Sequence, residues 1–186
     1  SDIHGNALAL EAVLADMAVR DWPVEVTLPG GVVHRLQRYD IDAQQIEVDL
    51  LPSWFWPYAF GRDIAPALRE EFVAIWSRLL PLTQPVKPVW TLRDYHSPNL
   101  LWLPQRKGLG RVGLIDTQDC VLGHPAYDLA SMLQDARVDI AFDEADALFA
   151  QYCALRAASG LFDRGEFAAA FAILGAQRAT KILGIF

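Results

Sequence analysis

The chain has 186 residues and a net charge of −7, and 53% of its residues are hydrophobic while 21% are charged. This length and apolar content favour one domain with a buried core and exclude an intrinsically disordered chain. The basic residues are scattered and form no stripe for a phosphate backbone, which excludes nucleic acid as an expected partner.

No apolar run approaches the roughly 20 residues of a membrane helix, so no membrane contact is expected. The two cysteines, Cys120 and Cys153, are too few for a disulfide framework and lack the close spacing of a zinc site. A reducing compartment fits them best, and we therefore expect a cytoplasmic protein.

Hydrophobic periodicity predicts helices in the first half of the chain. One spans residues 7–17, and its apolar face is formed by Leu10, Val13, Leu14 and Met17. A second spans residues 64–79, where apolar side chains recur at spacings of three and four and Asp63 is the expected N-cap. Residues 42–51 suit a further helix. Between residues 24 and 38, β-branched residues around a Pro-Gly-Gly turn predict a loop with short strands.

The second half combines one hairpin with further helices. Two short apolar runs, 100–103 and 112–115, flank a polar loop, which is typical of an antiparallel hairpin. Helices are expected over 127–133, 144–157 and 165–182. The sequence therefore predicts an α+β fold that is mainly helical.

Three oxygen-bearing side chains stand around the predicted hairpin in an order that suits phosphoryl transfer. Such a reaction needs a carboxylate that takes the proton of the acceptor hydroxyl and oxygen ligands that hold Mg²⁺ against phosphates. Asp94 is followed by four residues and then Asn99, the spacing of a kinase catalytic loop, and Asp116 ends the second strand. The entry and exit of a hairpin lie at the same end of the structure, so Asn99 and Asp116 can share a metal. Taken singly, each of these residues also suits a turn or a cap.

The segment from Arg93 to Leu100, Arg-Asp-Tyr-His-Ser-Pro-Asn-Leu, resembles the catalytic loop of the aminoglycoside phosphotransferase and choline kinase superfamily. The later Gly-His-Pro-Ala-Tyr-Asp-Leu-Ala from Gly123 to Ala130 resembles a signature that follows the metal-binding strand in that superfamily. Within it, the chain is most similar to bacterial kinases that phosphorylate N-acetylmuramate and N-acetylglucosamine at the anomeric position. That similarity rests on three further segments, Leu92 to His96, Gln118-Asp119, and Gly175 to Arg178.

The resemblance implies an ATP-dependent kinase of a small sugar, with Mg²⁺ as cofactor, in cell-wall sugar recycling. Residues 22–186 would form the C-terminal lobe of a protein-kinase-like phosphotransferase. Asp94 would be the catalytic base. Asn99 and Asp116 would bind the cofactor as metal ligands, and Asp119 would be a second-metal or water-network ligand. His96 would order the loop, and Asp128 would cap and brace its own helix.

The chain departs from the family pattern at two positions, and it lacks the features of an upper lobe. Leu92 stands where many relatives have a first loop histidine, and Thr117 stands where the cell-wall sugar kinases usually have Phe. The upper lobe of such a kinase needs a strand lysine on the nucleotide phosphates, but no lysine precedes Lys87 and no Gly-x-Gly-x-x-Gly occurs. We therefore expect that this chain lacks the N-terminal lobe and that this lobe is its missing partner. We also expect the chain alone to have negligible kinase activity.

The first six residues point to a different enzyme. Ser-Asp-Ile-His-Gly-Asn resembles the opening of calcineurin-like metallophosphoesterases, in which an Asp and a His, here Asp2 and His4, bind the first of two metals. The later metal motifs of that family do not occur in this chain. Residues 1–21 are therefore expected to be a segment of separate origin. A metal-dependent phosphoesterase and a non-catalytic binding or assembly module remain the alternative functions.

Overall fold

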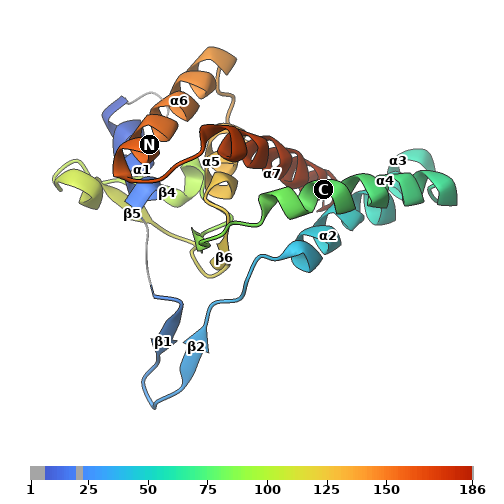
Figure 1. Ribbon diagram of the computed structural model, residues 1–186, viewed down its shortest axis with the longest axis horizontal. Helices are drawn as coiled ribbons and strands as arrows, with labels where there is room; N and C mark the ends of the chain where they lie inside the picture. The colour runs from blue at the N-terminus through green and yellow to red at the C-terminus, as the bar shows by residue number, and fades with distance from the viewer. Residues whose placement is uncertain (1–6, 20–22, 186) are drawn as a thin grey trace.

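The structure, a computed structural model, describes residues 7–19 and 23–185 (Figure 1). Its α-helices are α1 (Ala7–Val19), α2 (Ile41–Leu50), α3 (Trp56–Phe60), α4 (Pro66–Leu79), α5 (Ala126–Leu133), α6 (Phe142–Ser159) and α7 (Arg164–Ile185). The described residues also form one π-helical turn, η1 (Leu51–Phe55), and three 3₁₀ turns, η2 (Leu80–Thr83), η3 (Ser97–Asn99) and η4 (Gly108–Arg111).

The strands form three separate antiparallel pairs. They are β1 (Glu25–Thr27) with β2 (Val33–Arg35), β3 (Val89–Thr91) with β6 (Val121–Gly123), and β4 (Leu100–Trp102) with β5 (Val112–Leu114). This combination of many helices with small sheets agrees with the predicted α+β class. None of the described helices is both long and apolar enough to cross a lipid bilayer.

Helix α5 lies at the centre of the fold, and all eight of its residues are buried. It packs against α6 and α7, and the main apolar cluster around it includes the fully buried Tyr95, Tyr127 and Tyr152. Helix α1 joins the same cluster and lies against α6, η4 and β5. Val13, Leu14 and Met17 are buried there, which confirms the predicted apolar face; the side chain of Leu10 is outside the described part.

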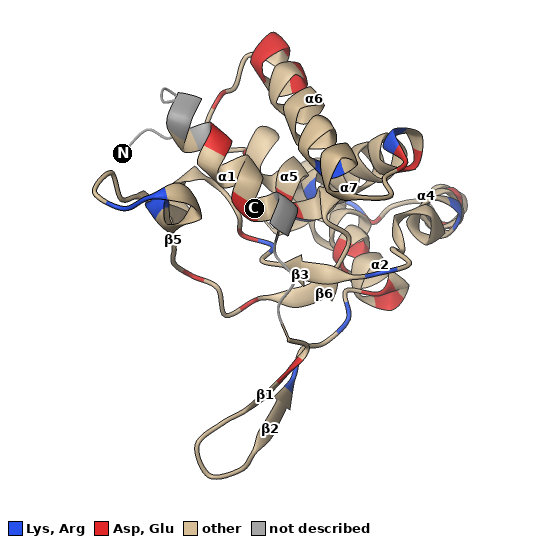
Figure 2. Ribbon diagram, turned by 60° about the vertical axis from the view of Figure 1, so that its left-hand side comes forward, with Lys and Arg blue, Asp and Glu red and all other residues tan. Residues whose placement is uncertain are grey.

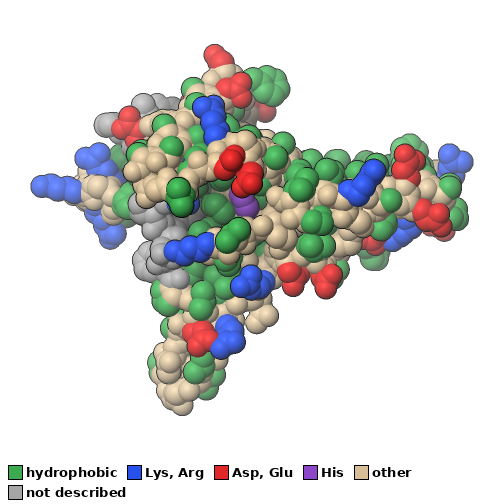
Figure 3. All heavy atoms as spheres, viewed as in Figure 1, with side chains coloured by type: hydrophobic (Ala, Val, Ile, Leu, Met, Phe, Trp, Pro, Cys, Tyr) green, Lys and Arg blue, Asp and Glu red, His purple; other side chains and the backbone are tan. Residues whose placement is uncertain are grey.

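Helices α2, α3 and α4 and the last turns of α7 form an arm that extends from the central body (Figure 1). Val48, Trp76 and Leu80 make a small core inside it. Its surface stays apolar in places, as Figure 3 shows, and Trp54 and Tyr58 are 68% and 84% exposed.

The β1–β2 hairpin projects from the body on its own (Figures 1 and 2). It carries five exposed apolar side chains, Val24, Val26, Leu28, Val32 and Val33. The predicted loop with short strands is therefore confirmed. Figure 2 also shows that basic and acidic residues are dispersed over the described elements rather than gathered in one basic stripe.

One local prediction was wrong, and proline explains it. Helix α4 begins at Pro66 with Ala65 at the N-cap, not Asp63. The fixed φ of proline suits the first helical position, and it sets the start two residues after the apolar pattern begins. At the end of α4, Pro81 occupies the first turn of η2, where its missing N–H costs no hydrogen bond.

Candidate active site

The β4–β5 hairpin brings Asn99 and Asp116 to one end of the molecule. Leu100 pairs with Leu114, and one step further the amide of Ile115 donates to the carbonyl of Asn99 over 3.1 Å. Asp116 is the next residue along the chain, so it leaves the strand beside Asn99. The predicted hairpin is confirmed, and with it the adjacency of these two residues.

Asn99 also closes the loop that contains Asp94. Its side-chain Nδ2 donates to the carbonyl of Asp94 over 3.1 Å, and the amide of His96 donates to the same carbonyl over 3.1 Å. The amide of Asn99 in turn donates to the carbonyl of His96 over 2.9 Å. These bonds hold Asp94, Asn99 and Asp116 around one loop and one hairpin end, so the structure brings the three predicted residues together.

Two residues of this region have left-handed backbone conformations, Arg93 with φ 67° and Asp116 with φ 60°. Such conformations cost non-glycine residues on the order of 1–3 kcal/mol each and persist where neighbouring contacts enforce them. Arg93 directly precedes Asp94, and Asp116 is itself a predicted site residue. The local strain is thus concentrated at the predicted active site.

Helix α5 supplies the contacts that hold Arg93. The Asp128 carboxylate accepts hydrogen bonds from the amides of Leu92 over 2.9 Å and of Arg93 over 3.0 Å. Ser131 Oγ donates to the carbonyl of Arg93 over 3.1 Å. Asp128 therefore holds the predicted catalytic loop in place, and its role as a cap of its own helix stays a prediction. His124 Nδ1 accepts a hydrogen bond from the amide of Ala126, the first residue of α5, over 3.1 Å.

A partly buried carboxylate that the sequence reasoning missed anchors the same loop from the other side. Glu47 of α2 forms an ion pair with Arg93 and accepts a hydrogen bond from the Tyr39 hydroxyl. It also accepts from Gln177 Nε2 and from the Lys181 ammonium of α7, each over 2.9 Å. Burial acts to raise the pKa of Glu47, but the Lys181 charge and these hydrogen bonds outweigh it and hold that pKa below its ordinary value.

His96 is buried in the loop, and burial together with the nearby Arg137 charge lowers its pKa. A neutral, enclosed imidazole suits the ordering role that the resemblance implied. His124 is likewise held neutral, because burial, assisted by the Arg156 charge, lowers its pKa to about 4.

The donor set at the hairpin end suits Mg²⁺. Mg²⁺ prefers oxygen ligands and is ordinarily held by one or two protein carboxylates or amides together with substrate phosphates. The Asp116 carboxylate is exposed and accepts from Gln118 Nε2 over 2.8 Å. The Asn99 amide is oriented by its bond to the Asp94 carbonyl. Asp119 is exposed and, within residues 7–19 and 23–185, shares no hydrogen bond with the other three predicted residues.

No group of three His, Cys, Asp or Glu side chains in the described ranges is placed to hold a metal by itself. Asp2 and His4, the predicted phosphoesterase ligands, lie outside the described residues.

A cavity of about 410 Å³ opens beside Asp94. It lies between the catalytic loop, the start of α5, the segment after α5 and the end of α7. Its described lining consists of Asp94, Tyr127, Ala136, Arg137, Arg178, Lys181, Ile182 and Ile185. The volume falls in the range of small-molecule sites.

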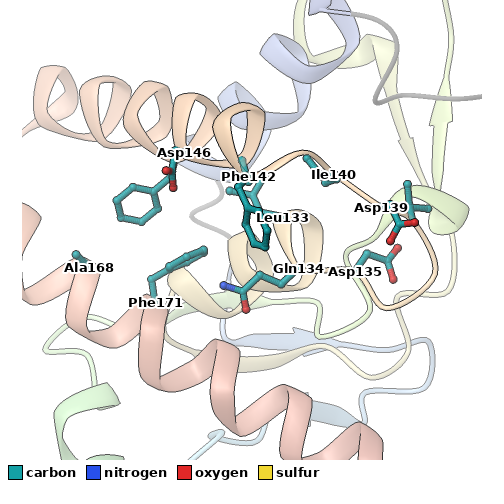
Figure 4. A pocket seen from close by; sticks show the side chains of 12 residues that line it. Leu133, Gln134, Asp135, Asp139, Ile140, Phe142, Asp146, Ala168 and Phe171 are labelled. Carbon is teal, nitrogen blue, oxygen red and sulfur yellow. The ribbon is translucent and has the colours of Figure 1, made fainter.

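A second cavity of about 520 Å³ lies between the end of α5, α6 and α7 (Figure 4). Leu133, Phe142 and Phe171 face this space, with Asp135 and Asp139 at one side. None of the four predicted site residues lines it, so the cavity beside Asp94 is the candidate acceptor site.

Comparison with known families agrees with this geometry. The model of the phosphotransferase enzyme family matches residues 11–170, a range that contains the catalytic loop, the hairpin and α5. The chain belongs to the phosphotransferase enzyme family. The predicted superfamily and the predicted enzyme class are thereby confirmed.

Similar curated proteins carry one name. The chain is 39% identical over 158 residues to an N-acetylmuramate/N-acetylglucosamine kinase of Caulobacter vibrioides, a match that covers 84% of this chain and 42% of the relative. It is 34% identical over 188 residues to the kinase of that name from Neisseria meningitidis, covering 97% of this chain and 51% of the relative. The Pseudomonas putida kinase is 27% identical over 192 residues, with 98% and 51% covered. This phosphotransferase-family chain thus spans about half the length of the curated relatives it matches.

Proposed function

We propose that the chain is the acceptor-binding and metal-binding lobe of an ATP-dependent kinase that phosphorylates an amino sugar, N-acetylmuramate or N-acetylglucosamine. The observation that carries the proposal is the gathering of Asp94, Asn99 and Asp116 around one hairpin end, next to a cavity that Asp94 lines. The names of the relatives supply the acceptor class. Cytoplasmic cell-wall sugar recycling is the corresponding setting.

In this proposal Asp94 faces the acceptor hydroxyl in the cavity, orients it and takes its proton. Asn99 and Asp116 bind Mg²⁺ together with the ATP phosphates, and Asp119 is a second ligand. When bound, Mg²⁺ neutralises charge on the transferred phosphoryl group. The bracing of the loop by Asp128 keeps Asp94 in place before substrate arrives, so little reorganisation is needed during the reaction.

We further propose that the 186-residue chain is inactive without a nucleotide-binding lobe. Its lysines are Lys87, Lys107 and Lys181, and Lys181 is paired with Glu47 in the structure. None of them stands where a strand lysine of an upper lobe would contact nucleotide phosphates. Nucleotide-dependent phosphorylation of either sugar by the purified chain would overturn this part of the proposal.

The kinase function itself is tested by a segment exchange. The part of the Caulobacter vibrioides kinase that matches this chain is replaced by this chain, so that the relative supplies the remaining half. Transfer of phosphate from ATP to N-acetylmuramate or N-acetylglucosamine is then measured. We expect transfer that is lost in the Asp94→Asn variant. A hybrid that unfolds cooperatively on heating yet transfers phosphate to neither sugar would contradict the proposal.

The two alternatives have their own tests. A phosphoesterase would use Asp2 and His4, and Mn²⁺-dependent hydrolysis of p-nitrophenyl phosphate that disappears in His4→Ala would support it. A binding module is favoured by the exposed valines of the β1–β2 hairpin, such as Val32 at 62% exposure.

The separate origin of residues 1–21 stays a proposal, because packing of α1 against the core does not report where a segment comes from.

A further inference from the structure

Three of the described residues that line the cavity beside Asp94 are cations, although the whole chain is acidic. Arg137, Arg178 and Lys181 line it, and Asp94 is the one carboxylate among its described lining residues. The chain as a whole carries a net charge of −7. A lining cation that has no carboxylate partner of its own can attract an anionic group into the cavity.

Helix geometry places these groups on one wall. Arg178, Lys181, Ile182 and Ile185 are spaced by three, four and seven residues, so they share one face of α7. The isoleucines make the apolar part of that wall, and the two cations make its polar part. Arg137 reaches the cavity from the segment that follows α5.

The three cations differ in how their charges are matched within the protein. Lys181 is paired with the partly buried Glu47 over 2.9 Å. Arg137 lies 3.7 Å from Asp135, and its side chain is 53% exposed. Both therefore have a carboxylate partner already.

Arg178 has none among the described residues. It is 6% exposed, and its guanidinium donates to the backbone carbonyl of Gln134 over 3.3 Å. A buried charge without an opposite charge costs several kcal/mol of desolvation. The same fork of N–H donors binds a carboxylate through two parallel hydrogen bonds. Arg178 is thus placed to receive an anion that enters the cavity.

We propose that Arg178 binds a carboxylate on the acceptor while Asp94 engages the hydroxyl that receives the phosphoryl group. This inference rests on the proposed sugar-kinase function and adds a preference to it. N-acetylmuramate carries a lactyl carboxylate that N-acetylglucosamine lacks. The acidic sugar is therefore the preferred acceptor, and Arg178 is the residue that distinguishes the two.

Titration calorimetry of the 186-residue chain tests this with three sugars, N-acetylmuramate, its neutral carboxamide and N-acetylglucosamine. A charge-assisted pair of hydrogen bonds corresponds to roughly a tenfold or larger difference in affinity. We expect N-acetylmuramate to bind at least about tenfold more tightly than its carboxamide, and the carboxamide to resemble N-acetylglucosamine.

Variants locate the effect. Arg178→Gln should remove the preference for the acid and change N-acetylglucosamine binding by less than about twofold. Lys107→Gln removes one positive charge from the exposed β4–β5 loop and should leave the preference intact. The comparison of the acid with its carboxamide uses the unaltered chain, so it stands even where Arg178→Gln fails to fold in a thermal unfolding control.

Equal affinities for the acid and its carboxamide would overturn the inference and leave the kinase proposal standing, since phosphate transfer is measured separately in the exchanged protein. Binding of inorganic phosphate that N-acetylmuramate does not displace would also overturn it, because Arg178 would then serve a phosphate. Absence of binding by all three sugars would contradict both proposals.

Discussion

At the scale of single residues, the site is built around contacts that join distant parts of the sequence. The proximity of Asp94, Asn99 and Asp116 could be predicted because they lie within 23 residues of chain, from 94 to 116, in the order that the reaction needs. Glu47 could not be, because its partners Arg93 and Gln177 stand 46 and 130 positions away and no local pattern marks them. Arg178 was part of a recognised segment, but its exposure to the cavity follows from packing alone.

Glu47 is predicted to be coupled energetically to the cations around it. Changing Glu47→Gln leaves Lys181 buried without its partner, so the single change should lower the free energy of unfolding by about 2–4 kcal/mol. Lys181→Met should lower the free energy of unfolding less in the Glu47→Gln variant than in the wild type. A double-mutant cycle by urea unfolding should give a coupling of about 1–3 kcal/mol. Strict additivity of the two changes would show that the ion pair is not energetically important.

At the scale of elements, the helices were predictable because their apolar patterns are long enough to have a period, and the hairpin β4–β5 was predictable because two apolar runs lie close in sequence on either side of a polar loop. The β3–β6 pair was not predicted, since strands of three residues carry almost no alternation and their partners lie about 30 residues apart. Residues 52–60, for which the sequence predicted no element, are helical. The end points of elements were decided by prolines and by side-chain caps.

The cap of α5 gives a prediction about pH. His124 accepts from the Ala126 amide through a neutral Nδ1, and its pKa in the folded protein is about 4 against 6.5 for an unperturbed histidine. Between these values the unfolded chain binds more protons than the folded one, so stability rises with pH from about 4 to 6.5 and is lost as pH falls through that window. The loss attributable to this group is at most about 3 kcal/mol.

The test compares unfolding free energies of the wild type and His124→Asn across that pH window. Asn retains a side-chain acceptor for the cap and does not titrate, so the variant should show a flatter profile below pH 6.5. If the unfolding free energies of the two proteins had the same slope against pH, the pKa of His124 would not be lowered in the folded protein.

The junction between α7 and α2 gives a second prediction at this scale. A Cβ added at Gly184 would lie 2.5 Å from Leu50 Cβ and 2.6 Å from the Leu50 carbonyl carbon, so backbone would have to move. Gly184→Ala should therefore lower thermal stability by about 1–3 kcal/mol. Gly175→Ala in the same helix is the matched control, because the atoms it would meet belong to the flexible end of Gln134. Equal effects of the two changes would contradict the close approach of the helices.

At the scale of the whole molecule, the structure is a helical body with two projections, the arm and the β1–β2 hairpin (Figure 1). An isolated two-stranded hairpin is at best marginally stable in water, and this one exposes five apolar side chains from Val24 to Val33. A surface of that kind suits contact with another folded unit, in agreement with the proposed need for a nucleotide-binding lobe. Sequence composition could not reveal it, because apolar content does not tell which side chains stay exposed.

The most direct test of the account is the position of the metal on the chain. In amide NMR spectra of the 186-residue chain, added Mn²⁺ should broaden the signals of Asp94, Asn99 and Asp116 first, and excess Mg²⁺ should restore them. The Asp116→Asn variant should weaken this broadening. Broadening centred on the acidic segment around Asp135 to Asp146, with the signals of Asn99 and Asp116 unaffected, would contradict the assignment of the phosphoryl-transfer site.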